Sequence, residues 1–112
     1  MRITGLKKNL QFRQVYREGK REDGQKVTIC YMYRDKEGVL PGFVASRKNV
    51  GKANQRNRAK RLMREAFLEL KKRFVKKNVW IIFVASFDPG KTPYDELKKD
   101  IENSLIKAGL IL

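Results

Sequence analysis

The segment from Arg47 to Arg64 carries eight basic side chains and no acidic one. Eight uncompensated cations repel one another, so this segment must expose a face to solvent or to a polyanion. Apolar residues recur at helical spacing through the same region, which predicts a helix from Asn54, or Ala53, to about Phe74. The apolar stripe consists of Ala59, Leu62, Met63, Ala66, Phe67, Leu70 and Phe74. The fold must cover this stripe and leave the charged face open.

Three other segments are rich in β-branched and aromatic residues and predict strands. They are Val27–Arg34, about Gly42–Ser46, and Val79–Phe87. A turn signal at Asp35–Gly38 predicts a hairpin between the first two strands. The basic helix joins the second strand to the third, which predicts parallel pairing of these two. The third strand is apolar almost throughout, as expected of a strand covered on both faces.

Two more helices complete the predicted order of helix, strand, strand, long helix, strand and helix. They are Leu10–Glu18 and Pro93–Ala108. The polar segment Gly19–Lys26 is predicted to be a loop, with a short edge strand as the alternative. The sequence therefore predicts a single domain over residues 1–112, of the α/β (α+β) class. We expect a two-layer sandwich in which a small mixed sheet packs against the helices.

The residue types that protein-based catalysis requires are scarce in this chain. There is no histidine, the commonest general base and metal ligand, and Cys30 is the one cysteine. The acidic residues are scattered in positions that suit loops, caps and helix surfaces, whereas a metal-dependent nuclease needs converging carboxylates. We therefore expect no catalytic residue and no metal site in the chain itself.

Several features bear on where the protein works. A lone cysteine suits the reducing cytoplasm, and no apolar run reaches the roughly 18 residues of a membrane span. The N-terminal stretch MRITGLKKNL lacks the apolar segment of a signal peptide. We expect a cytoplasmic protein that has no membrane partner and no obligate protein partner.

The distribution of charge favours RNA as a partner. Residues 47–77 hold thirteen basic and two acidic residues, and so carry +11 of the net charge of +15. On an ordinary solvated helix face, acidic residues lie one turn from the basic ones and limit their repulsion. No acidic residue lies between Arg47 and Arg64, which favours nucleic-acid binding. Phe12 and Tyr16 share one face of the first predicted helix. They are either core contacts or part of an aromatic groove on which unpaired bases stack.

The segment GKANQRNRAKRLMREAF resembles the signature of the bacterial ribonuclease P protein subunit, and LKKNLQFRQVYREG resembles the first helix of that family. The position of the strand VWIIFVA also fits. The resemblance implies an α/β sandwich with a left-handed crossover around the basic helix, against the usual right-handed rule. It also implies a holoenzyme that removes the 5′ leader of precursor tRNA and whose catalytic component is RNA with bound Mg²⁺.

The resemblance implies two RNA contacts, one with the catalytic RNA subunit and one with precursor tRNA. The RNA subunit would be bound by Lys52, Arg56, Asn57, Arg58, Lys60, Arg61 and Arg64. The single-stranded leader would lie in a cleft lined by Phe12, Tyr16, Tyr31, Arg47 and Lys48, with Tyr33 as the alternative to Tyr31. From the residues alone, a non-enzymatic RNA-binding module such as a ribosome-associated protein is the alternative. Such a module would bind RNA without any effect on cleavage.

Overall fold

The computed structural model describes residues 5–112; residues 1–4, with which the N-terminal stretch begins, lie outside the described part. The elements are α1 (Asn9–Glu18), β1 (Lys20–Asp23), β2 (Val27–Tyr33), β3 (Gly38–Val44), α2 (Ala53–Leu70), β4 (Asn78–Ala85) and α3 (Tyr94–Lys107). This confirms the three predicted helices, and of the two alternatives for Gly19–Lys26 the short edge strand is the one present, as β1. The long basic helix is shorter than predicted, because it tightens into a 3₁₀ turn at Lys71–Arg73.

The four strands form one mixed sheet in the order β1-β2-β4-β3. β3 pairs in parallel with β4, with Gly42 opposite Ile82, which confirms the predicted pairing across the basic helix. The predicted hairpin between the second and third strands is wrong, because β4 lies between them and pairs antiparallel with β2. The hairpin of the sheet is instead β1 with β2.

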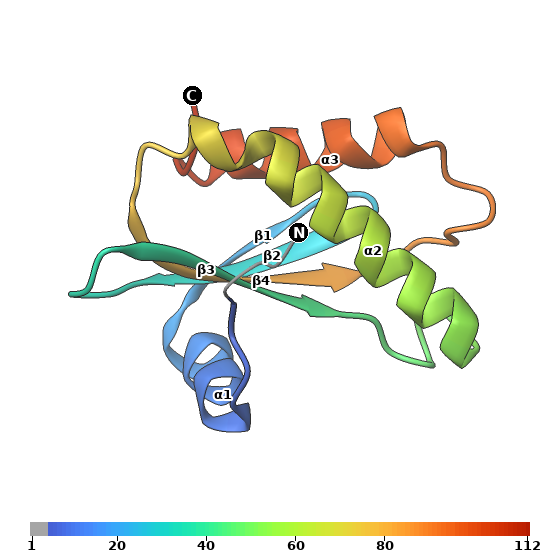
Figure 1. Cartoon of the computed structure of the whole chain (residues 1–112), viewed down its shortest axis with the longest axis horizontal. Coiled ribbons are helices and arrows are strands. Elements are labelled where there is room, and N and C mark those ends of the chain that lie inside the picture. The colour runs from blue at the N-terminus through green and yellow to red at the C-terminus, as the bar shows by residue number, and fades with distance from the viewer. Residues whose placement is uncertain (1–4) are drawn as a thin grey trace.

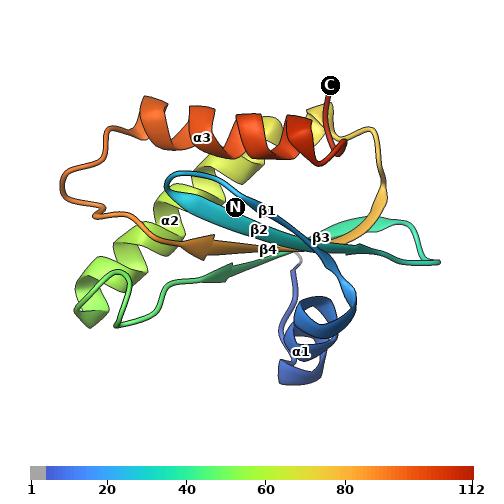
Figure 2. The ribbon, with the colours of Figure 1, turned by 180° about the vertical axis from the view of Figure 1, so that it is seen from behind.

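The helices cover both faces of this sheet, as Figure 1 shows: α2 and α3 lie above it, and the short α1 lies below. Figure 2 shows the same arrangement from behind, with the hairpin of β1 and β2 in front. The predicted packing of a small mixed sheet against the two long helices is confirmed, and α1 adds a cover on the opposite face. The left-handed course of the β3–α2–β4 crossover stays a prediction.

Two apolar clusters correspond to the two faces. The larger lies under α2 and α3, and the apolar stripe of α2 contributes to it with five buried residues: Ala59, Met63, Ala66, Phe67 and Leu70. Phe67 makes edge contacts with Phe43, Phe74 and Phe83 at centroid distances of 6.1, 5.9 and 5.8 Å. Each such aromatic pair adds roughly 0.5–1.5 kcal/mol beyond its area burial. These contacts fix α2 on the sheet, so its basic face points away from the core.

The smaller cluster lies under α1 and contains Leu6, Val15, Cys30 and Ile82. Because side chains alternate along a strand, Ile82 points toward α1 while its neighbours Ile81 and Phe83 point toward α2 and α3. All three β4 side chains are fully buried. The predicted two-sided burial of this strand is thus confirmed, and it explains why β4 occupies the middle of the sheet.

Candidate nucleic-acid interface

Most cations of α2 project away from the apolar stripe and meet solvent. Arg58, Arg61 and Arg64 are exposed, as are Asn57 and the preceding Lys52, whereas Arg56 and Lys60 are half-buried. Within residues 5–112, none of the eight basic residues from Arg47 to Arg64 forms a salt bridge. The structure therefore brings the residues predicted to bind the RNA subunit onto one helix without neutralising their charge.

The N-terminal end of α2 adds to this positive field. Its first turn holds no acidic residue, and Lys52 at the N-cap position makes no capping hydrogen bond through its side chain. The helix dipole places partial positive charge at this same end, where it reinforces the lysine. In this region the Nε of Arg56 and the Oε1 of Gln55 are buried without a hydrogen-bond partner. Arg56 lies three residues before Ala59 and seven before Met63, so it projects from the apolar side of the helix, which agrees with its half-buried position.

Arg47 and Lys48 lie in the turn between β3 and α2, and both are exposed. The turn is held by two hydrogen bonds to Ser46: the Asn49 N–H donates to its Oγ (3.1 Å) and the Val50 N–H to its backbone oxygen (2.9 Å). Gly51 then takes a φ of +116°, a conformation that favours glycine. The turn thereby holds Arg47 and Lys48 close to the start of the basic helix.

On the opposite side of the sheet, α1 presents the two predicted aromatic residues differently. Phe12 is half-buried and packs against the smaller core cluster, whereas Tyr16 is 50% exposed. Partial burial of its ring raises the pKa of the Tyr16 hydroxyl, and nearby Cys30 adds to the increase. The hydroxyl therefore stays protonated at neutral pH. Tyr16 is accessible to a ligand, while Phe12 is a core contact that stays partly exposed.

The strand aromatic expected beside them is not there. Tyr31 is 7% exposed and belongs to the core cluster under α2 and α3, on the sheet face opposite α1. Tyr33 follows the same alternation, with its ring 6.0 Å from that of Tyr31. The assignment of Tyr31, or of Tyr33, to a cleft beside α1 is therefore wrong. Cys30 and Met32 are the β2 residues that face α1. The period-two pattern of the strand groups these two residues on one face, but it does not say which face α1 covers.

Phe12 also borders a pocket that links the two predicted residue sets. The pocket lies at the edge of β3, has a volume of about 240 Å³, and is lined by residues that include Lys7, Phe12, Pro41, Gly42, Lys60 and Arg64. The Arg64 guanidinium lies 5.2 Å from the centroid of the Phe43 ring. Sequence reasoning placed Phe12 in one surface and Lys60 and Arg64 in another, and it missed Lys7 and Gly42.

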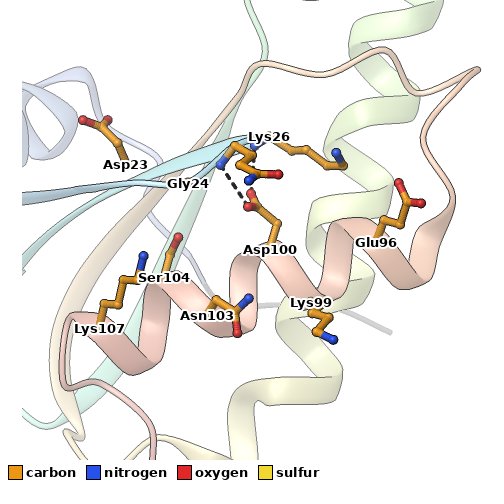
Figure 3. A pocket seen from close by; sticks show the side chains of 10 residues that line it. Asp23, Gly24, Lys26, Glu96, Lys99, Asp100, Asn103, Ser104 and Lys107 are labelled. Atoms are coloured by element: carbon orange, nitrogen blue, oxygen red, sulfur yellow. Dashed lines mark hydrogen bonds between the residues drawn. The ribbon is translucent and has the colours of Figure 1, made fainter.

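A larger hollow, of about 590 Å³, lies between the β1–β2 turn and α3 (Figure 3). Its lining mixes acids and lysines. The carboxylate of Asp100, which Figure 3 shows directed at the turn, accepts the backbone N–H groups of Gln25 (2.9 Å), Lys26 (2.9 Å) and Val27 (3.1 Å). These three hydrogen bonds hold α3 against the β1–β2 hairpin. We therefore interpret the hollow as a structural contact between the two elements.

Within residues 5–112, no three His, Cys, Asp or Glu side chains come together in a way that could hold a metal ion. In the same part of the chain, no helix combines the length and apolar character needed to cross a membrane.

Comparison with known proteins identifies the family to which the chain belongs. The family model described as ribonuclease P matches residues 2–109. A ribonuclease P protein component from Clostridium kluyveri is 33% identical over 111 residues, which cover 98% of each chain. One from Symbiobacterium thermophilum is 35% identical over 108 residues, covering 95% of this chain and 91% of the relative.

Solved structures show the same fold. The RNase P protein of Staphylococcus aureus superposes with a TM-score of 0.84 at 22% identity, covering 99% of this chain and all of that one. The RNase P protein of Thermotoga maritima gives a TM-score of 0.82 at 23% identity, with 94% and 97% covered. The family model spans almost the whole chain, and both of the relatives described above exceed 30% identity over nearly their full length. The chain therefore belongs to the ribonuclease P protein family.

Proposed function

We propose that this chain is the RNA-binding subunit of a ribonuclease P, in which it helps a catalytic RNA remove the 5′ leader of precursor tRNA. The observation that carries the proposal is the run of eight basic residues from Arg47 to Arg64, none of which forms a salt bridge within residues 5–112. A protein that neutralises phosphates with such residues releases counterions, which drives binding to RNA. Membership of the ribonuclease P family supports the RNA subunit of that enzyme as the partner.

The division of labour follows from what the side chains can do. Glu69, Asp23 and Asp100 are each engaged by donors of the chain itself, and among residues 5–112 no three His, Cys, Asp or Glu side chains group in a way that could hold a metal ion. We therefore place the Mg²⁺ of the reaction on the RNA and assign this chain no catalytic residue. Its contribution is to reduce phosphate repulsion where two RNA molecules meet, and to hold them in register.

Two surfaces divide this task. The basic face of α2 binds the RNA subunit through Lys52, Arg56, Asn57, Arg58, Lys60, Arg61 and Arg64. The leader lies beside α1, with Tyr16 and Phe12 as stacking partners and Arg47 and Lys48 as phosphate contacts. Cys30 takes the place on the sheet first expected of Tyr31. Single-stranded RNA suits this second surface because its bases are free to stack, whereas duplex RNA hides them.

The proposal is tested by reconstituting cleavage of precursor tRNA with a bacterial catalytic RNA at low Mg²⁺. The protein is expected to restore cleavage under conditions in which the RNA alone is nearly inactive. A variant with Arg58→Gln and Arg61→Gln should restore less, while the matched variant Lys99→Gln on α3 should behave as the wild type. Failure of the folded protein to restore cleavage with a cognate RNA would overturn the proposal. We place this activity in the cytoplasm.

A further inference from the structure

Aliphatic side chains are exposed at the corner of the molecule where the end of α2 meets the end of α3. Val75 is 46% exposed, Ile106 in the last turn of α3 is 45% exposed, and Leu112 is also exposed. The Val75 N–H donates to the Leu110 carbonyl oxygen at 2.9 Å, which joins the two segments, and Figure 1 shows the end of the ribbon marked C beside the end of α2. Val75, Ile106 and Leu112 are the apolar centre of this surface, which we call the α2–α3 corner.

The segments that form the apolar centre also carry positive charge. They contribute five exposed lysines: Lys71, Lys72, Lys76, Lys77 and Lys107. None of the five forms a salt bridge within residues 5–112, and Glu102 of α3 is already paired with Arg73. The corner is separated from Lys52, at the start of α2, by the length of an 18-residue helix, about 27 Å. Its charge is therefore distinct from that of the basic face.

Backbone pairing holds the corner in place before any partner arrives. Phe74 pairs with Ile111 in an antiparallel bridge, and both side chains are buried in the larger core cluster. The Arg73 guanidinium also donates to the Leu112 carbonyl oxygen at 2.8 Å. The exposed side chains of Val75 and Ile106 thus project from a fixed backbone. A fixed surface loses little freedom on binding, which favours association.

The mixture of aliphatic side chains and lysines favours a protein over other polyanions. RNA would use the lysines alone, because aliphatic side chains offer no aromatic face on which bases stack. A second copy of the chain would repel the corner, since each copy carries a net charge of +15. An anionic membrane would repel the RNA with which the chain assembles; this last argument rests on the proposed function.

We propose that the α2–α3 corner binds an acidic segment of another protein. Carboxylates of that segment meet the lysines, and its aliphatic side chains cover Val75, Ile106 and Leu112. The apolar centre and charged rim match the general anatomy of protein interfaces. None of the corner residues belongs to the proposed RNA contacts, so the segment binds while RNA occupies the other end of α2. The corner thereby attaches the assembled ribonuclease P to a further protein without displacing its RNA.

The test measures binding of two labelled peptides to the reconstituted complex of the protein with the catalytic RNA. One peptide alternates pairs of glutamate and leucine, and the other has serine in place of every leucine and so keeps the charge. The glutamate–leucine peptide should bind at least roughly tenfold more tightly. Val75→Ser with Ile106→Ser should weaken its binding roughly tenfold. Lys72→Gln with Lys76→Gln should weaken it roughly three- to tenfold, and less at high salt.

Matched variants control for general losses of charge or apolar surface. Leu10→Ser removes an exposed leucine on α1, and Lys91→Gln with Lys99→Gln removes two exposed lysines near the start of α3. Both controls should bind the peptide as the wild type does. Equal binding of the two peptides, or equal losses in corner and control variants, would overturn the proposal. So would corner variants that weaken binding of phosphatidylglycerol vesicles, or of an RNA duplex, more than binding of the peptide.

Cleavage of precursor tRNA by the same preparations separates this inference from the proposed function. The corner variants should support cleavage as the wild type does, because they change no proposed RNA contact. Wild-type cleavage without peptide binding would overturn the corner proposal alone. If the wild type supports no cleavage, the proposed function falls, and the same two peptides titrated against the free protein decide the corner. Circular dichroism of each variant shows that lost binding does not reflect lost folding.

Discussion

The ring of Phe12 lies against Gly42 so closely that a Cβ at residue 42 would come within 2.7 Å of two ring carbons. Real side chains essentially never approach this closely, so glycine at position 42 is what allows α1 to settle on the edge of β3. Leu6 adds to the same contact, 3.5 Å from the position of that Cβ. This one relationship positions an aromatic residue beside the cations of α2.

We expect Gly42→Ala to push Phe12 out of place and to lower the free energy of unfolding by about 1–3 kcal/mol, the usual cost of overpacking. It should also weaken binding of leader-bearing precursor tRNA at temperatures where the protein stays folded. Urea denaturation measures the first effect. Gly90→Ala is the matched control, because the nearest atom to its added Cβ is an Asp88 carboxylate oxygen at 3.3 Å in an exposed turn. Equal losses of stability in the two variants would contradict this account.

Arg58 is exposed on the basic face and pairs with no acid within residues 5–112. Arg58→Gln relieves repulsion along the helix, so the free energy of unfolding should change by no more than about 0.5 kcal/mol. RNA binding should nevertheless weaken, and the slope of log affinity against log salt should fall by about one if Arg58 contacts a phosphate. Titrations at several salt concentrations measure this. An unchanged slope would place Arg58 outside the interface.

Tyr16 and Tyr31 lie on opposite faces of the sheet, so substitutions at these two positions distinguish the functions of the two faces. Tyr16→Leu should reduce affinity for leader-bearing precursor tRNA roughly three- to tenfold more than affinity for mature tRNA, because it removes a stacking surface. Tyr31→Phe should not discriminate between the two RNAs, since Tyr31 is buried under the long helices. Parallel binding assays on both RNAs decide this. Equal weakening of both RNAs by Tyr16→Leu would show that Tyr16 does not contact the leader.

Much of the fold could be predicted from local patterns, because the helices and strands follow from periodicities of 3.6 and 2 residues. The strand order could not. The turn signal at Asp35–Gly38 is equally compatible with a hairpin and with a loop that leaves space for another strand. β4 takes that space because its side chains are apolar on both faces, and the centre of the sheet buries both. Such long-range pairing leaves no mark near the turn.

The same limit applies to the candidate site. The alternation of β2 correctly separates Tyr31 and Tyr33 from Cys30 and Met32, but only tertiary packing decides which set α1 covers. The basic face of α2 was easier to predict from the sequence, since its charges and its apolar stripe lie on one continuous helix. Lys7 and Gly42 were missed because they join the site through contacts between distant segments.

Glu69 ties α2 to α3, and its ionisation makes this tie dependent on pH. The Lys98 Nζ donates to Glu69 Oε2 at 2.6 Å and the Tyr94 hydroxyl to Oε1 at 2.7 Å, and both lower the pKa of Glu69 below its usual 4.5. Because the pKa is lower in the folded state, this contribution to stability is present above pH 4.5 and disappears as the pH falls through the folded-state pKa.

Glu69→Gln should therefore lower the urea midpoint at pH 7, and the difference from the wild type should shrink as the pH falls well below 4.5. Glu65→Gln on the same helix is the control, because Glu65 is exposed and forms no salt bridge within residues 5–112. A difference that stays constant from pH 7 to pH 3 would show that hydrogen-bond geometry, and not the carboxylate charge, holds the two helices.

Substitution of Asp100 tests whether the larger hollow is a structural contact between α3 and the β1–β2 hairpin. Its carboxylate accepts three backbone N–H groups of the β1–β2 turn (Figure 3), and Asp100→Asn removes the charge and one acceptor oxygen. The free energy of unfolding should fall by about 2 kcal/mol, whereas Asn103→Ala, one turn along the same helix, should change it by no more than about 0.5 kcal/mol. Because α3 carries none of the proposed RNA contacts, the Asp100→Asn protein should still restore cleavage at temperatures where it is folded. Loss of RNA binding without loss of folding would assign the hollow a role in recognition that its hydrogen bonds do not indicate.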